Sequence, residues 1–407
     1  MLIRGDVLVS NALSYSVVYQ GAYPPPQMSA GVRRVRDICR GLAAAGGNVR
    51  MIVPAHFGPL EQPSDTDFDV VSVGPVQDRP TVSSRLHFWK QVTQTVVRQA
   101  PDLCLFYDTT LDSYYAMQTI KRAGIAVGYE LCDLFSTSEP KIGRRVARAL
   151  AERFLPRVSQ CNIVITRHIQ QWVKKVAPAT HSILIPGLFD TESFQHDMQK
   201  AAYFRERYGI DHSEVIVCYN GSWWKQKGLA MLVEAFKLAR SLTETPMKLV
   251  VSGSFTRSPV EDDVSELAKQ MNVEADVILP GRLPTEEVIG LLSAADVVVS
   301  SSTDDPFNHA AFPTKVAEYA GMGRPILATN VGDVPLYFED GVNAVLTDAH
   351  SVASMADGLT RLARDSALRE RLGNAAKQTS QDHFNFRRCG QRIDDDVRAL
   401  LHENKCA

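Results

Sequence analysis

Residues 297–328 read VVVSSSTDDPFNHAAFPTKVAEYAGMGRPILA, and this stretch decides the fold class. An apolar run ends at Ser301, a polar loop follows, and Pro313 opens a short helix. A Gly-Met-Gly-Arg-Pro turn then leads into a second apolar run at 325–328. Strands that alternate with helices in this way indicate a parallel sheet covered by helices on both faces. The stretch predicts an α/β protein.

The same alternation runs through the whole chain. In the second half, the other expected strands are 215–219, 248–252, 276–279 and 344–346. In the first half, the expected strands are 7–9, 49–53, 70–73, 103–107, 126–131, 163–166 and 182–185. The pattern therefore predicts two complete sheets, one in each half.

A chain of 407 residues is too long for one ordinary core, which favours two domains. The turn-rich segment 186–190 lies between the two sets of strands, so we expect the boundary near residues 187–205 and a hinge there that opens or closes a cleft. The expected Rossmann-like domains are 1–195 and 196–384, and a C-terminal helix at 385–407 is expected to pack back onto the first.

Composition narrows the function classes. Lys and Arg number 44 against 46 Asp and Glu, so no overall positive field recruits nucleic acid and an anionic ligand needs a local cluster. Seven cysteines without a CxxC pair indicate thiols in a reducing compartment, and ten histidines without HxxxH spacing make a metal site unexpected. The start, MLIRGDVLVSNALS, has no long apolar core, and no run approaches about 18 apolar residues. We expect a cytoplasmic protein with at most peripheral membrane contact on the inner face.

The first candidate site is the strand-loop-helix segment YNGSWWKQKGL at 219–229. The turn at Gly221 lets backbone approach a phosphate, and Lys227 with the following helix N-terminus supplies positive potential to a diphosphate. The alternative is an ordinary loop whose lysines are solvated.

The second candidate site is the helix that Pro313 opens. Free N–H groups at Thr314 and Lys315 would face a phosphate or a sugar. One turn further, the Glu318 carboxylate can accept hydrogen bonds from vicinal hydroxyls such as those of a ribose. The alternative for Glu318 is an ion pair on the helix surface.

These segments together resemble the nucleotide-binding domain of glycosyltransferase family 4, a family of retaining enzymes with the GT-B fold, in which two Rossmann-like domains face each other across a cleft. The resemblance rests on segments in a fixed order: Gly221, 227–228, 250–254, 279–287, 294–297, 313–325 and 333–341, with 185–190 and Phe194 as the interdomain joint and 24–31 as the first loop. It spans nearly the whole chain.

The resemblance implies a hexosyl transfer from a UDP- or GDP-type sugar to a sugar, a lipid-linked glycan or a small molecule, as in surface polysaccharide biosynthesis, with no metal or further cofactor. Lys227 would hold the diphosphate, Glu318 the ribose, and backbone around Arg282 and Leu283 the base. The donor-binding residues implied are Gly221, Ser222, Lys225, Lys227, Gly228, Ser254, Arg257, Arg282, Leu283, His309, Ala310, Phe312, Thr314, Lys315 and Glu318.

The sequence departs from the family pattern at two positions. Ser222 stands where the family commonly has an arginine, and Lys225 or Arg257 could replace that cation. Ala310 stands where the family has the first glutamate of an E-x7-E pair, and Asp304, Asp305 or His309 could contact the sugar instead.

The first half is expected to bind the acceptor. Asp133 follows the strand at 126–131 and either contacts the reacting groups as a catalytic residue, beside Lys227 and Glu318, or caps the next segment. Gly31, Arg33 and Arg34 are candidates for acceptor binding.

A helix is expected over 141–158, because apolar residues recur every fourth position from Ile142 to Val158 while basic residues gather on another face. That basic face either is solvated on a packed helix or meets a membrane or an anionic acceptor.

Two other functions stay open for the whole chain, which we expect to be a monomer or homodimer. One is a non-catalytic GT-B protein that binds a nucleotide sugar or serves as a scaffold. The other is a GT-B epimerase or phosphorylase.

Overall fold

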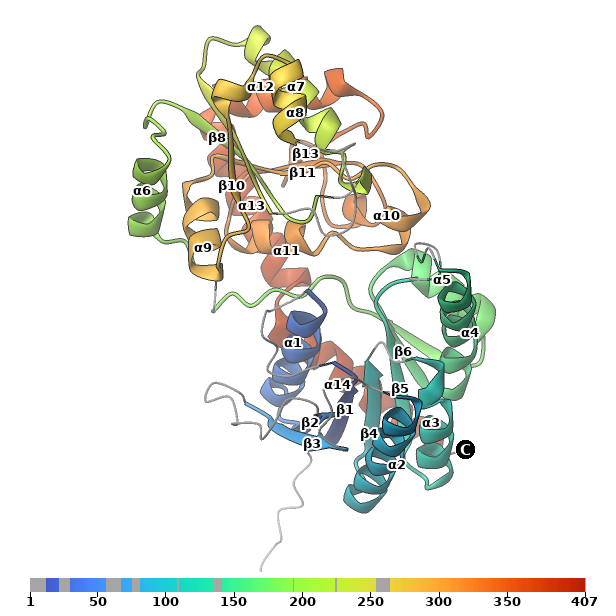
Figure 1. The fold of residues 1–407 in the computed structure, drawn as a ribbon. Coiled ribbons are helices and arrows are strands. Elements are labelled where there is room, and N and C mark those ends of the chain that lie inside the picture. The colour runs from blue at the N-terminus through green and yellow to red at the C-terminus, as the bar shows by residue number, and fades with distance from the viewer. Residues whose placement is uncertain are drawn as a thin grey trace, which may run out of the picture. The chain divides into compact units, whose positions relative to one another are not determined.

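The computed structural model forms two compact units, which Figure 1 shows as a ribbon. One comprises Met1–Val164, Trp172–Ile183 and Cys389–Ala407, and the other Ile165–Gln171 and Leu184–Arg388. The structure describes residues 12–21, 30–55, 67–74, 81–107, 110–134, 136, 139, 141–192, 194–223, 225–253 and 264–406.

The first unit is built on a seven-stranded sheet in the order β3-β2-β1-β4-β5-β6-β7. Its strands are β1 Ser14–Tyr19, β2 Asn48–Pro54, β3 Asp69–Val73, β4 Leu103–Tyr107, β5 Ala126–Leu131, β6 Cys161–Val164 and β7 His181–Leu184. The pairs from β3 across to β6 are parallel, as the alternating sequence pattern predicts. The strand expected at residues 7–9 lies outside the described residues, and β1 was missed because its SYSVVY sequence begins with alternating serines rather than an apolar run.

Helices connect these strands and cover the sheet. They are α1 Ala30–Ala44, α2 Val82–Gln99, α3 Tyr114–Arg122, α4 Ile142–Val158 and α5 Arg167–Val176. The last helix, α14 Phe386–Cys406, reaches this unit, where the Tyr15 hydroxyl donates to Asp394 at 2.5 Å. A Cβ at Gly390 would lie 2.0 Å from the Gly41 carbonyl carbon, so α14 and α1 cross at a distance that only glycine allows.

The second unit is built on a six-stranded sheet in the order β10-β9-β8-β11-β12-β13. Its strands are β8 Val215–Asn220, β9 Met247–Ser252, β10 Val277–Gly281, β11 Val297–Ser300, β12 Ile326–Thr329 and β13 Val345–Thr347. All of the pairs are parallel, and each strand lies within two residues of its predicted bounds. The prediction of two parallel α/β sheets is confirmed.

Helices lie on both faces of the second sheet. They are α6 Met198–Arg207, α7 Leu229–Leu242, α8 Val264–Gln270, α9 Thr285–Ala294, α10 Pro306–Ala310, α11 Thr314–Gly321, α12 Val352–Arg364 and α13 Ser366–His383. On one face α7 packs against α8 and α12, and on the other α11 packs against α13 (Figure 1). Side chains of α7, α8 and α12 bury a continuous apolar cluster against the strands, which holds the strand ends in place.

Helix α4 has the predicted bounds, but most of its apolar stripe does not pack. Ile142, Val146, Leu150 and Phe154 are exposed, while Val158 is buried. Four of the five residues of the stripe are therefore exposed, because the helix packs through a different face at its C-terminal end. No helix in the described part of the chain is both long enough and apolar enough to cross a bilayer.

Candidate functional site

The strand order of the second sheet identifies where a ligand fits. From β8 the chain adds β9 and β10 on one side, and from β11 it adds β12 and β13 on the other side. The neighbouring strands β8 and β11 therefore form the topological switch point. In open α/β sheets, ligands bind outside the carboxyl ends of the strands at such a point. The loop at 221–228 follows β8 and the loop at 301–305 follows β11, so the fold brings the two candidate segments to one edge.

Hydrogen bonds join these two loops. The Ser301 hydroxyl donates to the carbonyl of Lys227 at 2.6 Å, and the N–H of Thr303 donates to the carbonyl of Gln226 at 3.0 Å. The Asn308 side-chain amide donates to the same Gln226 carbonyl at 2.8 Å. These bonds fix the backbone on which Lys227 is carried.

Gly228 permits this close approach. Its φ is +62°, and a Cβ there would lie 2.1 Å from the carbonyl oxygen of Ser301. Any other residue would therefore be strained and would also push the two loops apart.

Lys227 lies in a short 3-10 helix, Lys225–Lys227, with its Nζ 5.9 Å from the centroid of the Phe307 ring. Such a cation–π contact orients the ammonium group. Phe307 is placed by α10, which Asp305 caps by accepting hydrogen bonds from the N–H groups of Phe307 and Asn308 at 2.8 and 3.0 Å. The cation therefore lies beside the loop that follows β11.

Helix α11 brings its N-terminus and Glu318 to the same edge. Thr314 and Lys315 open the helix, and N–H groups in a first turn have no partner within the helix. Glu318 is 8% exposed, and its Oε2 lies 2.8 Å from the Nζ of Lys315. The ion pair that sequence analysis offered as an alternative is thus formed, on a carboxylate that is mostly buried rather than solvated.

Tyr319 connects α11 to β8. Its hydroxyl accepts a hydrogen bond from the N–H of Asn220 at 3.1 Å and donates to the carbonyl of Asn220 at 3.2 Å. Burial raises the pKa of Tyr319 well above its ordinary value, so the phenol stays neutral and able to donate. These bonds attach α11 to the end of β8.

Sequence analysis missed Asn220 as a site residue. Asn220 ends β8 directly before Gly221, is 6% exposed, and its Nδ2 is a buried donor without a hydrogen-bond partner among the described residues. A buried amide donor is normally satisfied, so a bound ligand at this edge would relieve it. Its position at the last residue of a strand at the switch point is the signal that could have found it.

A second polar group lies on the loop after β11. The Asp304 carboxylate contacts His309 Nε2 at 2.6 Å and His350 Nε2 at 3.2 Å, and hydrogen bonds from His350 and His309 lower the pKa of Asp304. Asp304 and His350 line a cavity of about 370 Å³ that also includes Asp340 and Asp348. Sequence analysis named Asp304 and His309 but missed His350, which is distant in sequence.

Comparison with known proteins identifies the second unit. Residues 201–379 match the family model described as glycosyl transferases group 1. That match includes both loops, α11 and the whole switch-point edge. Residues 201–379 are therefore similar to a group 1 glycosyl transferase domain, and this segment is called the group 1 domain.

Curated relatives match the chain over a similar region. The N-acetyl-alpha-D-glucosaminyl L-malate synthase of Bacillus anthracis is 24% identical over 212 residues, which covers 50% of this chain and 52% of the relative. A D-inositol 3-phosphate glycosyltransferase of Corynebacterium aurimucosum is 28% identical over 179 residues, which covers 44% of this chain and 41% of the relative. The matches thus span about half the length of these relatives.

Solved structures match nearly the whole chain. Sucrose-phosphate synthase from Thermosynechococcus elongatus superposes with a TM-score of 0.72 at 18% identity, covering 96% of this chain and 100% of that one. Anabaena Alr3699/HepE in complex with UDP-glucose superposes with a TM-score of 0.70 at 17% identity, covering 95% and 100%. Together with the two parallel sheets, this likeness shows that the chain has the GT-B fold.

Within the group 1 domain, several predicted donor-binding residues lie at the switch point and others do not. Gly221, Ser222, Lys225, Lys227, Gly228, His309, Thr314, Lys315 and Glu318 follow β8 or β11 or open α11. Arg282 and Leu283 follow the edge strand β10, two strands from β8. Ser254 and Arg257 lie outside the described residues.

Two further predicted residues are buried inside the group 1 domain. Ala310 is 3% exposed and its carbonyl accepts from the Thr166 hydroxyl at 3.1 Å. Phe312 is 5% exposed and its ring packs edge-on against Tyr337 and tilted against Phe384. The structure therefore places these two side chains in the interior, at and just after the end of α10, the helix that carries His309.

In the first unit, the switch point lies between β1 and β4, and Gly31, Arg33 and Arg34 stand on α1, which follows β1. Arg34 is 5% exposed and forms an ion pair with Glu130, which is fully buried near the end of β5. Burial raises the pKa of Glu130, and Arg34 offsets part of that rise. Asp133 follows β5 at the same edge and is half-buried.

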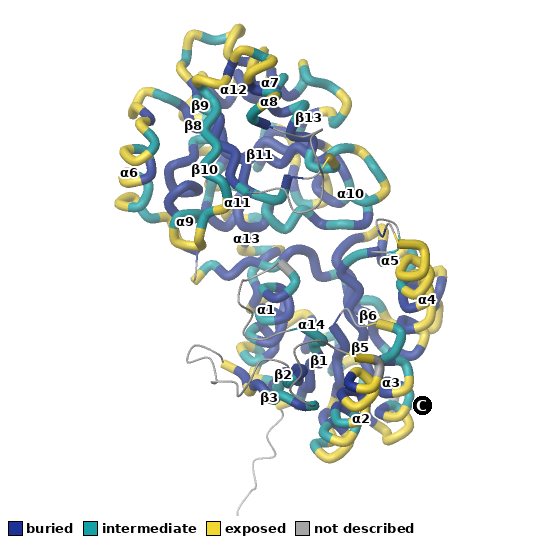
Figure 2. The backbone as a smooth tube through the Cα atoms, in the orientation of Figure 1, coloured by how far each residue is buried: buried dark blue, intermediate teal, exposed yellow. Residues whose placement is uncertain are grey.

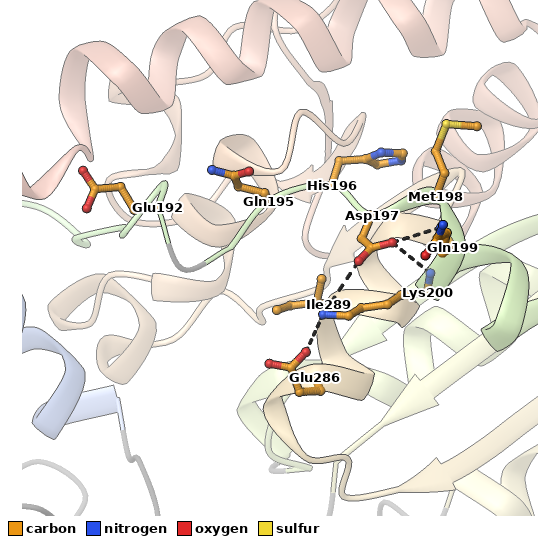
Figure 3. A pocket seen from close by; sticks show the side chains of 9 residues that line it. All are labelled: Glu192, Gln195, His196, Asp197, Met198, Gln199, Lys200, Glu286 and Ile289. Carbon is orange, nitrogen blue, oxygen red and sulfur yellow. Dashed lines mark hydrogen bonds and ion pairs between the residues drawn. The ribbon is translucent and has the colours of Figure 1, made fainter. Parts of the chain in front are cut away.

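A cavity of about 450 Å³ lies beside the N-terminus of α6 (Figure 3). Asp197 caps α6 by accepting from the N–H groups of Gln199 and Lys200 at 2.9 and 3.0 Å, and Lys200 forms an ion pair with Glu286 of α9. None of the predicted donor-binding residues lines this cavity, and its charged groups are paired, Asp197 and Glu286 with Lys200 and Glu192 with Arg387.

Proposed function

We propose that this protein is a retaining glycosyltransferase of family 4 type that transfers a hexosyl unit from a nucleotide-diphosphate sugar. The observation that carries the proposal is the convergence of Lys227, the α11 N-terminus and Glu318 at the β8/β11 switch point. The group 1 domain, which contains all three, supports it.

The diphosphate is assigned to Lys227 and the first N–H groups of α11. A lysine ammonium and an unpaired helix N-terminus both attract a doubly charged anion. Lys225, in the same 3-10 helix, stands in for the arginine that Ser222 replaces.

The ribose is assigned to Glu318, whose carboxylate is oriented by the Lys315 ammonium group at 2.8 Å. Backbone at Arg282 and Leu283 is assigned to the base, and His309, oriented by Asp304, to the donor sugar. The donor is of UDP or GDP type, and the solved complex of Alr3699/HepE with UDP-glucose, a protein of the same fold, supports a nucleotide sugar.

The proposed reaction breaks the bond between the anomeric carbon and the leaving phosphate oxygen. An acceptor hydroxyl oxygen bonds to that carbon on the same face, and the hydroxyl proton passes to the leaving phosphate oxygen. Such a step needs stabilisation of the departing diphosphate more than a strong protein base, and it requires no metal ion. Lys227 and the α11 amides supply that stabilisation.

The acceptor is assigned to the carboxyl edge of the first sheet. Arg33, on the helix α1 that follows β1, and Asp133, which follows β5, are the residues assigned to bind it. Arg34 acts there through its ion pair with Glu130, which fixes α1 relative to β5. We propose a sugar, a lipid-linked glycan or a small molecule as acceptor, in surface polysaccharide biosynthesis, and a cytoplasmic monomer or homodimer.

A transfer assay with the full chain tests this function. UDP- and GDP-linked hexoses are incubated with candidate acceptors, and the anomeric configuration of any product is read by NMR. We expect acceptor-dependent release of the nucleoside diphosphate with retained configuration, and a loss of at least about a hundredfold in rate for Lys227→Ala, since cations at a leaving group contribute roughly 3 kcal/mol. Lys237→Ala, on the outer side of α7, is the matched control.

The other functions give different results in the same assay. Nucleotide-sugar binding without turnover would indicate a non-catalytic binding protein. Conversion of the sugar nucleotide without acceptor, or only with inorganic phosphate, would indicate an epimerase or a phosphorylase.

A further inference from the structure

Helix α4 presents an apolar stripe to solvent. Ile142, Val146, Leu150 and Phe154 are 76%, 52%, 38% and 38% exposed. Residues four apart lie on one face of a helix, so these side chains form a continuous row about 18 Å long. Figure 2 shows α4 as a largely exposed helix.

The opposite face attaches the helix to the first unit. Ala151, Leu155 and Val158 are buried, and Glu152 is buried with its Oε1 accepting from the N–H of Ser136 at 2.9 Å. The exposed stripe is therefore not a requirement of folding, because the helix already has a packed face.

The charged residues of α4 are mainly basic, and Glu139, which precedes the helix, pairs with Arg148 at 3.6 Å. The segment 141–158 contains six basic residues, Lys141, Arg144, Arg145, Arg148, Arg153 and Arg157, and its single acidic residue is the buried Glu152. The Arg157 guanidinium lies 5.4 Å from the centroid of the Phe154 ring while its Nε donates to the carbonyl of Val176 at 2.6 Å, which holds a cation beside the stripe.

We propose that α4 docks on an anionic lipid bilayer, with the stripe inserted at the level of the headgroups and the arginines bound to lipid phosphates. An exposed row of Ile, Val, Leu and Phe on a helix whose charged side chains are mainly basic is the pattern of a helix that lies in a membrane interface. A protein with a net charge of −2 has no general attraction to an anionic surface, so the local positive charge of α4 determines which face binds. The proposal does not depend on the transfer reaction.

Vesicle sedimentation of the full chain tests the proposal. The vesicles are phosphatidylcholine alone and phosphatidylcholine mixed with phosphatidylglycerol, each at low and high salt, without any nucleotide sugar. The variants are Ile142→Gln/Val146→Gln/Leu150→Gln for the stripe and Arg144→Gln/Arg153→Gln for the charge. Met198→Gln/Leu242→Gln removes two exposed apolar residues of the second unit, 77% and 48% exposed, and is the matched control.

We expect the wild type and the control to bind the mixed vesicles at low salt and to dissociate from them at high salt. Both should bind pure phosphatidylcholine weakly or not at all. The stripe variant should bind at least about tenfold more weakly. The charge variant should bind roughly twentyfold more weakly, because each basic residue near an anionic surface contributes about fivefold. Circular dichroism of each variant confirms that it is folded.

Three results would overturn the proposal. The first is no binding of the wild type to the mixed vesicles. The second is equal binding by the folded stripe and charge variants. The third is a wild-type dimer that the stripe variant converts to a monomer with no vesicle binding, which would assign the stripe to a second copy of the chain.

Discussion

At the residue scale, Glu318 is the side chain on which the proposed donor site most depends. It is 8% exposed, its carboxylate pairs with Lys315, and it stands directly beside the tyrosine that holds α11 to β8. A carboxylate in that position is held ready to accept hydrogen bonds from two neighbouring hydroxyls.

We predict that Glu318→Ala weakens binding of the nucleoside diphosphate by about ten- to a hundredfold, since hydrogen bonds to a charged group contribute roughly 1.5–3 kcal/mol. Isothermal titration calorimetry measures this change. Glu339→Ala, which removes an exposed carboxylate of the same unit, should bind like the wild type. An unchanged affinity for Glu318→Ala would remove Glu318 from the site.

Asp304 gives a pH-dependent prediction. Hydrogen bonds from His350 and His309 lower the pKa of Asp304, so its contribution to stability is complete above the ordinary aspartate pKa of about 3.9 and disappears as pH falls through the lowered value. We expect wild type to be more stable than Asp304→Asn at pH 5 and this difference to shrink towards pH 3. Urea denaturation at several pH values measures it, and a difference that is constant with pH would contradict the assignment.

At the element scale, the sequence predicted the strands and helices of the site well because each is marked locally. The apolar runs of β8 and β11, and the proline before α11, are short-range signals, which do not depend on contacts with distant parts of the chain. Contacts between elements were not predictable in this way. The bonds of Asn308 to Gln226 and of His350 to Asp304 join residues 82 and 46 positions apart.

Helix α4 shows the limit of periodicity. The repeat from Ile142 to Val158 correctly gave a helix, yet it did not reveal which face packs, since an apolar stripe has the same sequence pattern whether it meets a core or a partner. Likewise Arg34 was identified as a cation near the acceptor, but its pairing with Glu130 depends on how α1 packs on β5.

The loop after β8 gives a prediction that separates backbone strain from steric contact. Gly228 and Gly209 both have φ of +62°, but only at Gly228 would a Cβ meet another chain segment. We expect Gly209→Ala to cost about 1 kcal/mol of stability. Gly228→Ala should cost more and should also weaken nucleotide binding at least about tenfold, because it displaces Lys227 from the loop after β11.

Thermal unfolding and calorimetry on both variants measure these effects. Equal stability losses with unchanged nucleotide affinity would show that the contact between Gly228 and Ser301 does not position Lys227.

At the scale of the whole molecule, each of the two parallel sheets creates a switch point, and among the described residues the lysines of the 3-10 helix Lys225–Lys227 follow the switch-point strand β8 of the second sheet. In the second unit that edge carries Lys227, the α11 N-terminus and Glu318, within a group 1 domain. In the first unit the corresponding edge carries a buried Arg34–Glu130 pair, whose charges largely cancel. This asymmetry is why the nucleotide is assigned to the second unit and the acceptor to the first.

A crystal structure of the protein with UDP or GDP tests this assignment most directly. The account predicts the diphosphate within hydrogen-bond distance of Lys227 Nζ and the first N–H groups of α11, with the ribose hydroxyls on the Glu318 carboxylate. A nucleotide bound elsewhere, such as in the cavity beside α6 or at the carboxyl edge of the first sheet, would contradict it.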